Sequence, residues 1–135
     1  MDDCIFCKIA SGAANSWKVY DDEAVYVFLD IEPVSPYHTL VIPKHHYENI
    51  FDIPEHELLR VMAAVKKTVM LYNEKLGINH VQIVNSSGTE AQQDVFHIHF
   101  HIVPRKQGDG QDIRWTTHPE LRTQFDQMLK QLEQD

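Results

Sequence analysis

The 135-residue sequence has few of the features that mark membrane, secreted or nucleic-acid-binding proteins. It has 2 cysteines, too few for a disulfide framework, and no apolar run near the roughly 20 residues that a membrane-spanning helix needs. Its N-terminus lacks the basic and apolar regions of a secretory signal, so a cytoplasmic location is expected. With 12 basic against 20 acidic residues and a net charge of −8, the chain is expected to bind neither nucleic acid nor a membrane surface.

The rest of the composition is that of one folded domain spanning residues 1–135. A hydrophobic fraction of 43% and a charged fraction of 24% are ordinary for globular proteins, and this length can bury a core without disulfides. No repeat or linker divides the chain. The unusual feature is histidine, which occurs 9 times and therefore accounts for one residue in fifteen.

Apolar patterns predict five strands and two helices. Runs of β-branched and aromatic residues favour strands, whereas apolar residues three or four positions apart favour helices. The expected strands are residues 18–20, 24–29, 39–42, 81–84 and 95–103. The expected helices follow capping boxes at 52–55 and 117–120, and their apolar stripes end at Leu76, before the stop at Gly77, and at Leu132.

This order of elements predicts an α+β domain. It has a mostly antiparallel five-stranded sheet, one long central helix and a C-terminal helix. The segment 105–111 contains two glycines and is predicted to be a mobile loop.

Three histidines alternate with bulky apolar residues in the segment 94–105. Because alternate side chains share one face of a strand, His97, His99 and His101 would line one side, about 6.6–6.8 Å apart. Close imidazoles oppose one another's protonation and strands do not favour them, so packing alone does not explain the pattern. They offer nucleophilic nitrogen, proton transfer and metal ligation. The apolar residues of the other face would point into the core: Ile98, Phe100 and Ile102.

This segment resembles the signature of the histidine triad (HIT) family, in which two apolar residues follow His-x-His-x-His. Residues 97–103, His-Ile-His-Phe-His-Ile-Val, match every element of that signature. The resemblance continues upstream at Cys4–Ile9, Phe28–Ile31 and His38–His46, so it covers roughly residues 4–105. It implies a HIT-like, nucleotide-binding fold that forms a homodimer, with residues 106–135 as a C-terminal extension.

The resemblance also implies cleavage at the α-phosphorus of a nucleotide through a nucleotidyl-histidine intermediate. The middle histidine of the triad, His99, would be the nucleophile. A neutral imidazole can attack in line if its second nitrogen is held by an acceptor. His101 would donate to a phosphate oxygen or to the leaving group, and His38 corresponds to the family's further active-site histidine.

Other residues correspond to positions that bind a purine nucleotide in the family. Asp30 matches the acidic residue that binds the ribose hydroxyls, and Gln93 matches a donor to the phosphate. Phe28 and Ile31 are candidates for packing against the base, although each could equally be an ordinary core residue.

The sequence departs from the family pattern beside the phosphate. Asp94 stands where the family often has a hydroxyl, so only its backbone is expected to contribute to phosphate binding. The family's phosphate-binding amide aligns without gaps with Ser86, and one inserted loop residue would move the match to Asn85, which we favour slightly.

The pair Cys4 and Cys7 is by itself a weak signal, shared by zinc knuckles and redox pairs. Some histidine triad proteins hold structural zinc on two such cysteines and two histidines. The matching histidines here are His46 and His97, and four nitrogen and sulfur ligands complete a tetrahedral structural site. The resemblance therefore implies a structural Zn²⁺ at Cys4, Cys7, His46 and His97.

Three functions fit these residues. The leading one is a hydrolase for nucleoside phosphoramidates or dinucleoside polyphosphates. A transferase or phosphorylase would use the same intermediate, but sugar-nucleotide relatives usually replace the third histidine with glutamine, and His101 is intact. A non-catalytic nucleotide-binding adaptor is the third.

Overall fold

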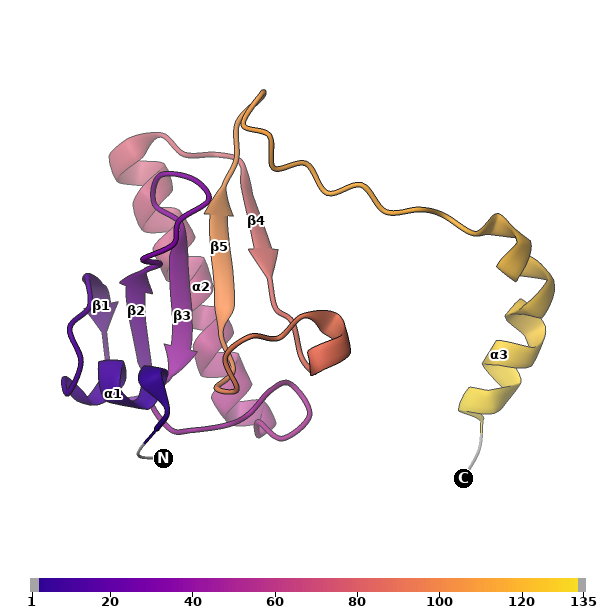
Figure 1. The fold of residues 1–135 in the computed structure, drawn as a ribbon, viewed down its shortest axis with the longest axis horizontal. Helices are drawn as coiled ribbons and strands as arrows, with labels where there is room; N and C mark the ends of the chain where they lie inside the picture. Colours follow the sequence, from indigo (N-terminus) through magenta and orange to yellow (C-terminus); the bar gives the residue numbers. More distant parts are fainter. Residues whose placement is uncertain (1–2, 134–135) are drawn as a thin grey trace.

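Residues 3–133 are described by the structure, a computed structural model, in which one sheet carries helices on both faces (Figure 1). The strands are β1 (Lys18–Asp21), β2 (Val25–Leu29), β3 (Thr39–Pro43), β4 (Val81–Val84) and β5 (Phe100–Pro104). The helices are α1 (Ile5–Ser11), α2 (Glu55–Leu76) and α3 (Phe125–Leu132), with 3-10 turns η1 (Thr89–Ala91) and η2 (Pro119–Gln124). None of the helices within residues 3–133 is both long and apolar enough to cross a membrane.

The five strands form a single antiparallel sheet in the order β1-β2-β3-β5-β4. This confirms the predicted α+β architecture with its long central helix and C-terminal helix. Because β5 pairs with β3 on one side and β4 on the other, the triad segment enters the interior of the sheet. His101 lies opposite Leu40 of β3 and Val84 of β4.

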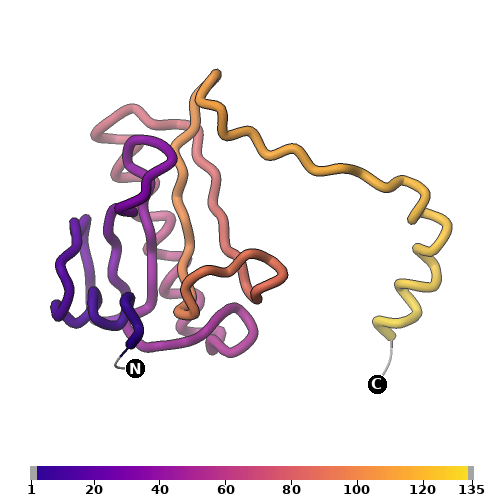
Figure 2. The backbone as a smooth tube through the Cα atoms, viewed as in Figure 1, coloured from indigo at the N-terminus to yellow at the C-terminus, as the bar shows by residue number. Residues whose placement is uncertain are grey.

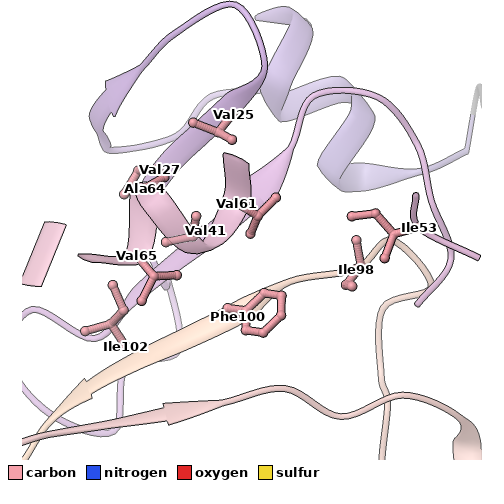
Figure 3. Packing of buried hydrophobic residues seen from close by; sticks show 10 residues of the cluster. All are labelled: Val25, Val27, Val41, Ile53, Val61, Ala64, Val65, Ile98, Phe100 and Ile102. Carbon is pink, nitrogen blue, oxygen red and sulfur yellow. The ribbon is translucent and has the colours of Figure 1, made fainter. Parts of the chain in front are cut away.

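Helix α2 covers one face of the sheet and forms the larger core with it (Figure 3). Ile98, Phe100 and Ile102 are buried in this core, as the alternation in the sequence predicted. Val61 and Val65 of α2 are buried against them. Met62 and Leu76 belong to the predicted apolar stripe of this helix but are more than one-third exposed. The sheet therefore covers only part of that stripe.

Helix α1 covers the other face and was not expected from the sequence. Its seven residues span two turns, too short for a periodic signal. Phe6 and Ile9 are its buried residues, and the Phe6 ring lies edge-on to Phe28 at 5.6 Å between ring centroids. The helix begins at Cys4, whose Sγ accepts a hydrogen bond from the Cys7 N–H at 3.3 Å. The cysteine pair therefore also starts this helix.

Neither predicted capping box forms within the described residues. Asp52 instead accepts hydrogen bonds from the amides of Glu48 and Asn49, and α2 begins after Pro54, whose φ of −64° suits that position. At the second box, His118 precedes the 3-10 turn η2, and α3 begins only at Phe125.

The predicted strand at 95–103 is also too long, because β5 begins at Phe100. The Ile98 amide donates to the carbonyl of Tyr47, in the loop before α2, and so leaves the ladder of the sheet. His97 and His99 therefore lie in an irregular segment that precedes the strand, and only His101 lies in β5.

The last part of the described chain projects away from the sheet (Figure 2). After β5 the backbone runs through an extended segment to η2 and α3, and residues 110–133 are all exposed. The loop that was predicted to be mobile is held by Arg105, which donates to both carboxylate oxygens of Asp109 at 2.7 Å.

Candidate active site

A cavity of about 290 Å³ lies on the α1 face of the sheet. Its wall contains five of the predicted catalytic and nucleotide-binding residues, namely Phe28, Asp30, Ile31, His99 and His101. Phe28 comes from β2, Asp30 and Ile31 follow that strand, and the two histidines come from the triad segment. The fold therefore brings together residues that are 70 positions apart in the chain.

His99 presents Nε2 as its free nitrogen. Its Nδ1 lies 2.9 Å from the carbonyl oxygen of His97, and since a carbonyl can only accept, Nδ1 carries the proton. The side chain is 5% exposed, and the Phe6 ring packs edge-on against it at 5.1 Å. The lone pair on Nε2 is thus available for attack, which is the arrangement that a nucleophilic imidazole needs.

His38 and His101 form a hydrogen-bonded pair whose protons can be assigned. The Val34 amide donates to Nδ1 of His38 at 3.0 Å, so the proton of the neutral His38 ring is on Nε2. That nitrogen lies 2.9 Å from Nδ1 of His101, which accepts the bond. The neutral His101 ring then carries its own proton on Nε2, as a donor.

Burial lowers the pKa of both rings of this pair. The pKa of His101 falls to about 4, because burial and then the neighbouring His99 and His38 disfavour its charge. The pKa of His38 is lowered chiefly by burial, and the Asp30 carboxylate opposes the change. Asp30 Oδ2 lies 3.4 Å from His38 Nε2 and 3.9 Å from His101 Nδ1. The pair is therefore neutral near pH 7 when no other charge is near.

The residues predicted to bind phosphate are not among those that line the cavity. Gln93 is buried, and its Nε2 donates to the carbonyls of Glu48 and Val95 at 2.7 and 3.0 Å. Asn85 donates from Nδ2 to the carbonyl of His99 at 3.0 Å, whereas Ser86 lies next to it, outside the lining of the cavity. This geometry does not favour a phosphate contact by Gln93, and it makes Asn85 a support for the backbone of His99.

Two residues of the cavity were missed or assigned differently from the sequence. Phe6 contacts His99 from α1, and the short Cys-Ile-Phe-Cys segment gave no signal for that contact. The Asp94 carboxylate does line the cavity, with Oδ1 3.5 Å from Nε2 of His99. A negative charge therefore faces the nucleophile, in addition to the backbone contribution that the sequence suggested.

Four other side chains form a second cluster beside the cavity, with ligand atoms all within 4.8 Å of one another. They are the four predicted zinc ligands, Cys4, Cys7, His46 and His97. Nδ1 of His97 lies 3.4 Å from Sγ of Cys4 and 3.5 Å from Sγ of Cys7. Nδ1 of His46 lies 3.4 Å from Sγ of Cys7.

The chemistry of this cluster fits a tetrahedral metal site. Nε2 of His97 donates to the carbonyl of Pro43 at 2.8 Å, which leaves the Nδ1 lone pair directed at the thiols. The side chain is completely buried, and burial lowers its pKa to about 4, so it does not carry a proton there. Burial and the adjacent Cys4 raise the pKa of the Cys7 thiol to about 11 when no cation is bound. Sulfur and nitrogen ligands in this number are those that Zn²⁺ prefers.

Comparison with known proteins places these residues in one family. The model of the HIT domain matches residues 11–108. An uncharacterized HIT-like protein of Methanocaldococcus jannaschii is 44% identical over 129 residues, which cover 96% of this chain and 98% of the relative. An adenosine 5'-monophosphoramidase of Candida albicans is 36% identical over 134 residues, which cover 94% of this chain and 85% of that protein.

Solved structures agree with the fold. A HIT family protein from Bacillus anthracis superposes with a TM-score of 0.88 at 34% identity, covering 97% of this chain and 95% of the other. A Zn-bound histidine triad family protein from Mycobacterium smegmatis superposes with a TM-score of 0.77 at 34% identity, covering 96% and 98%.

Proposed function

This chain belongs to the HIT family, and from that premise we propose that it is a nucleotide hydrolase that works through a covalent intermediate on His99. The observation that carries the proposal is the free Nε2 of His99, which faces the cavity while Nδ1 is held by the carbonyl of His97. The substrate that we propose is a nucleoside phosphoramidate or a dinucleoside polyphosphate. The relationship to an adenosine 5'-monophosphoramidase supports the first of these classes.

In the first step Nε2 of His99 attacks the α-phosphorus, and the bond from phosphorus to the leaving group breaks. His101 stays neutral, because burial lowers its pKa to about 4 and its Nδ1 accepts the hydrogen bond from His38. Nε2–H of His101 donates a hydrogen bond to the departing nitrogen or oxygen, which leaves with a proton taken from solvent. His99 keeps its Nδ1 proton on the His97 carbonyl, which stabilises the positive charge of the adduct.

In the second step water attacks the same phosphorus. The water releases a proton to solvent, the bond from phosphorus to Nε2 of His99 breaks, and the nucleoside monophosphate leaves. His38 acts through His101, because its Nε2–H holds Nδ1 of that ring as an acceptor. We assign Asp30 to the ribose hydroxyls and Phe28 and Ile31 to the base, since all three line the same cavity.

We further propose that Cys4, Cys7, His46 and His97 hold a structural Zn²⁺. The metal would compensate the charge of the two thiolates and tie α1 to the segment that carries the nucleophile. The support for this proposal is the four convergent ligand atoms, together with the Pro43 carbonyl that fixes the His97 ring.

Trapping of the intermediate tests the hydrolase. The protein is incubated with adenosine 5'-phosphoramidate and, separately, with diadenosine polyphosphates, then quenched and digested for mass spectrometry. We expect an adenylyl group on the peptide that contains His99, and no adduct in His99→Ala. An adduct on another residue, or full turnover by His99→Ala, would refute the mechanism. Nucleotide binding without turnover of either substrate would indicate the adaptor instead.

A further inference from the structure

Residues 35–38 form a tight turn that leads into β3 and sets the position of the His38 ring. The His38 amide donates to the carbonyl of Ser35 at 3.1 Å, and Pro36 and Tyr37 are the two central residues of the turn. Tyr37 has a φ of 67°, a left-handed conformation that glycine or asparagine usually supplies after the proline of such a turn. A tyrosine therefore needs other contacts to hold it there.

The same turn decides which nitrogen of His38 carries the proton. Because the chain turns back at Tyr37, the Val34 amide reaches Nδ1 of His38 and donates to it at 3.0 Å. That bond leaves the proton on Nε2, which donates to Nδ1 of His101 at 2.9 Å. A change of the backbone at Tyr37 would therefore move both the His38 ring and the amide that selects its tautomer.

Two buried hydroxyl groups hold the backbone of this turn. Thr39 Oγ1 donates to the carbonyl of Tyr37 at 2.6 Å, and it lies 2.7 Å from the hydroxyl of Tyr72 in α2. Since threonine has a single hydroxyl proton and the carbonyl can only accept, the second bond is donated by Tyr72. Thr39 is completely buried and Tyr72 is 4% exposed. The donors therefore run in one order, from Tyr72 to Thr39 and from Thr39 to the Tyr37 carbonyl.

Helix α2 contacts Tyr37 a second time, at its ring. The rings of Tyr72 and Tyr37 lie 5.4 Å apart, and the loop between β2 and β3 passes over the C-terminal part of α2 (Figure 1). Burial raises the pKa of the Tyr72 hydroxyl, although its hydrogen bond with Thr39 opposes the change, so Tyr72 keeps the proton that it donates. These contacts supply the restraint that the left-handed conformation of Tyr37 requires.

The alternation along β3 separates these hydroxyls from the reacting groups. Leu40 lies in the core under α1 and lines the active-site cavity, whereas Val41 lies in the core under α2. Thr39 shares the α2 face with Val41, and His38 shares the α1 face with Leu40. Thr39 is thus on the opposite side of the sheet from the cavity, and it can influence His38 only through the backbone of Tyr37.

We propose that Thr39 and Tyr72 are positioning residues for the reaction, because their hydroxyls hold the Tyr37 carbonyl and so keep His38 in the orientation and tautomer that fix His101. The inference rests on the proposed hydrolase, in which Nε2–H of His101 donates to the leaving group. Without the Thr39 hydroxyl, Tyr37 relaxes from its left-handed conformation and His101 is no longer held in one tautomer. Turnover then falls, whereas substrate affinity, which depends on the walls of the cavity, changes little.

Removal of single hydroxyls tests the proposal on the enzyme. Thr39→Val keeps the shape of the side chain, and we expect kcat for adenosine 5'-phosphoramidate to fall about 10- to 30-fold with KM within about two-fold. Thr39→Ser keeps the hydroxyl and should stay within about three-fold of the unmodified protein. The matched control is Thr68→Val, which removes an equally buried hydroxyl that bonds inside α2, to the Ala64 carbonyl at 2.8 Å. An equal loss of kcat in Thr68→Val would show a general effect on the fold and refute the proposal.

A double-mutant cycle asks whether Thr39 acts through His38. If it does, the variant that combines His38→Ala with Thr39→Val has the kcat of His38→Ala alone. A further loss of about ten-fold in the combined variant would show an independent effect and overturn the proposal. Tyr72→Phe, expected to lower kcat by about three- to five-fold, replaces Thr39→Val in the cycle if Thr39→Val does not fold.

The tautomers of the histidine rings give a readout that needs no turnover. In ¹⁵N spectra of the protein without substrate, the unmodified chain and Thr68→Val should show the Nε2–H form of His101. Thr39→Val should show a mixture of tautomers, and Tyr72→Phe a smaller change in the same direction. Unchanged tautomers in both would refute the positioning role even in an active enzyme. Changed tautomers in a protein that forms no adduct on His99 would support the positioning role and refute only the proposed hydrolase.

Discussion

His97 and His99 are two residues apart, yet their rings have opposite free nitrogens. His97 donates from Nε2 to the Pro43 carbonyl and turns Nδ1 to the thiols, whereas His99 donates from Nδ1 to the His97 carbonyl and turns Nε2 to the cavity. One carbonyl oxygen in each case decides which lone pair is available. The same residue type is therefore suited to metal binding at one position and to nucleophilic attack at the other.

The surroundings of the two rings strengthen the difference. The cluster around His97 contains two thiols and a second imidazole, a set without an exchangeable position for substrate. The cavity at His99 is lined by three carboxylates, a second histidine and two phenylalanine rings. We infer that loss of the first region would affect stability, and loss of the second would affect turnover.

The largest expected effect separates the two rings. His99→Ala should lower kcat by about 10⁴-fold or more, because no other group near the α-phosphorus replaces the nucleophile. Its Tm should stay within a few degrees of that of the unmodified protein. Steady-state hydrolysis of adenosine 5'-phosphoramidate and calorimetry measure both quantities. A variant that loses the fold as well as the activity would show that the two regions are not separable.

Removal of the metal should come next in size. Since the ligands come from α1, the segment before α2 and the triad segment, loss of Zn²⁺ should cost at least about 3 kcal/mol of unfolding free energy and lower Tm by roughly 10 °C. Dialysis against a chelator, followed by calorimetry and metal analysis, measures this. His97→Ala should behave in the same way without chelator. Less than one zinc per chain in fresh protein, with no response to chelation, contradicts the site.

The strands and α2 could be predicted from the sequence because their apolar patterns are long or strictly alternating. The set of catalytic and metal-binding residues came from the histidine triad resemblance, and the structure brings the metal-binding set together. Other features depend on tertiary contacts. Helix α1 is stabilised by the packing of Phe6 and Ile9 against the sheet. Gln93 does not line the cavity, because its side-chain amide donates hydrogen bonds to the carbonyls of Glu48 and Val95.

The conformation of residues 107–133 could not be predicted from the sequence pattern either. The stripe from Leu121 to Leu132 does predict a helix, but it does not say what the helix packs against. In the described structure every residue of that stripe is exposed, so its helical spacing does not mark a buried core. The apolar stripe of α2 is likewise wider than the part that the sheet covers, because Met62 is more than one-third exposed. The spacing of apolar residues alone therefore does not identify which of them are buried.

Removing the ring that holds His101 should have an intermediate effect. His38→Ala deletes the donor to Nδ1 of His101 and frees that ring to change tautomer. We expect kcat to fall roughly 100-fold with little change in KM. In ¹⁵N spectra the Nε2–H form of His101 should give way to a mixture of tautomers. A loss of rate with an unchanged tautomer would show that His38 acts otherwise than by positioning His101.

The pH dependence of stability tests the burial of His101. Its folded pKa of about 4 lies below the unfolded value of about 6.5, so the unfolded chain binds the proton more tightly. The contribution of the neutral His101 ring to the free energy of unfolding is therefore fully present above about pH 7. It declines as pH falls, by about 2 kcal/mol between pH 7 and 5. His101→Asn removes this contribution while leaving the other histidines. The measure is the difference between the two proteins in urea unfolding at each pH with excess Zn²⁺. Equal slopes in both proteins would contradict the burial of a neutral ring.

The smallest expected effect concerns the carboxylate of Asp94, which faces Nε2 of His99 at 3.5 Å. A negative charge at the edge of a phosphate site opposes an anionic substrate, but this side chain is 79% exposed and solvent screens it. Asp94→Asn keeps the size of the side chain and an oxygen that can accept from the Val95 amide. We expect KM for the phosphoramidate to fall by about two- to five-fold with kcat nearly unchanged, and the difference to vanish at high salt. A rise in KM would show that the Asp94 carboxylate contributes to substrate binding in the cavity at His99, contrary to this prediction.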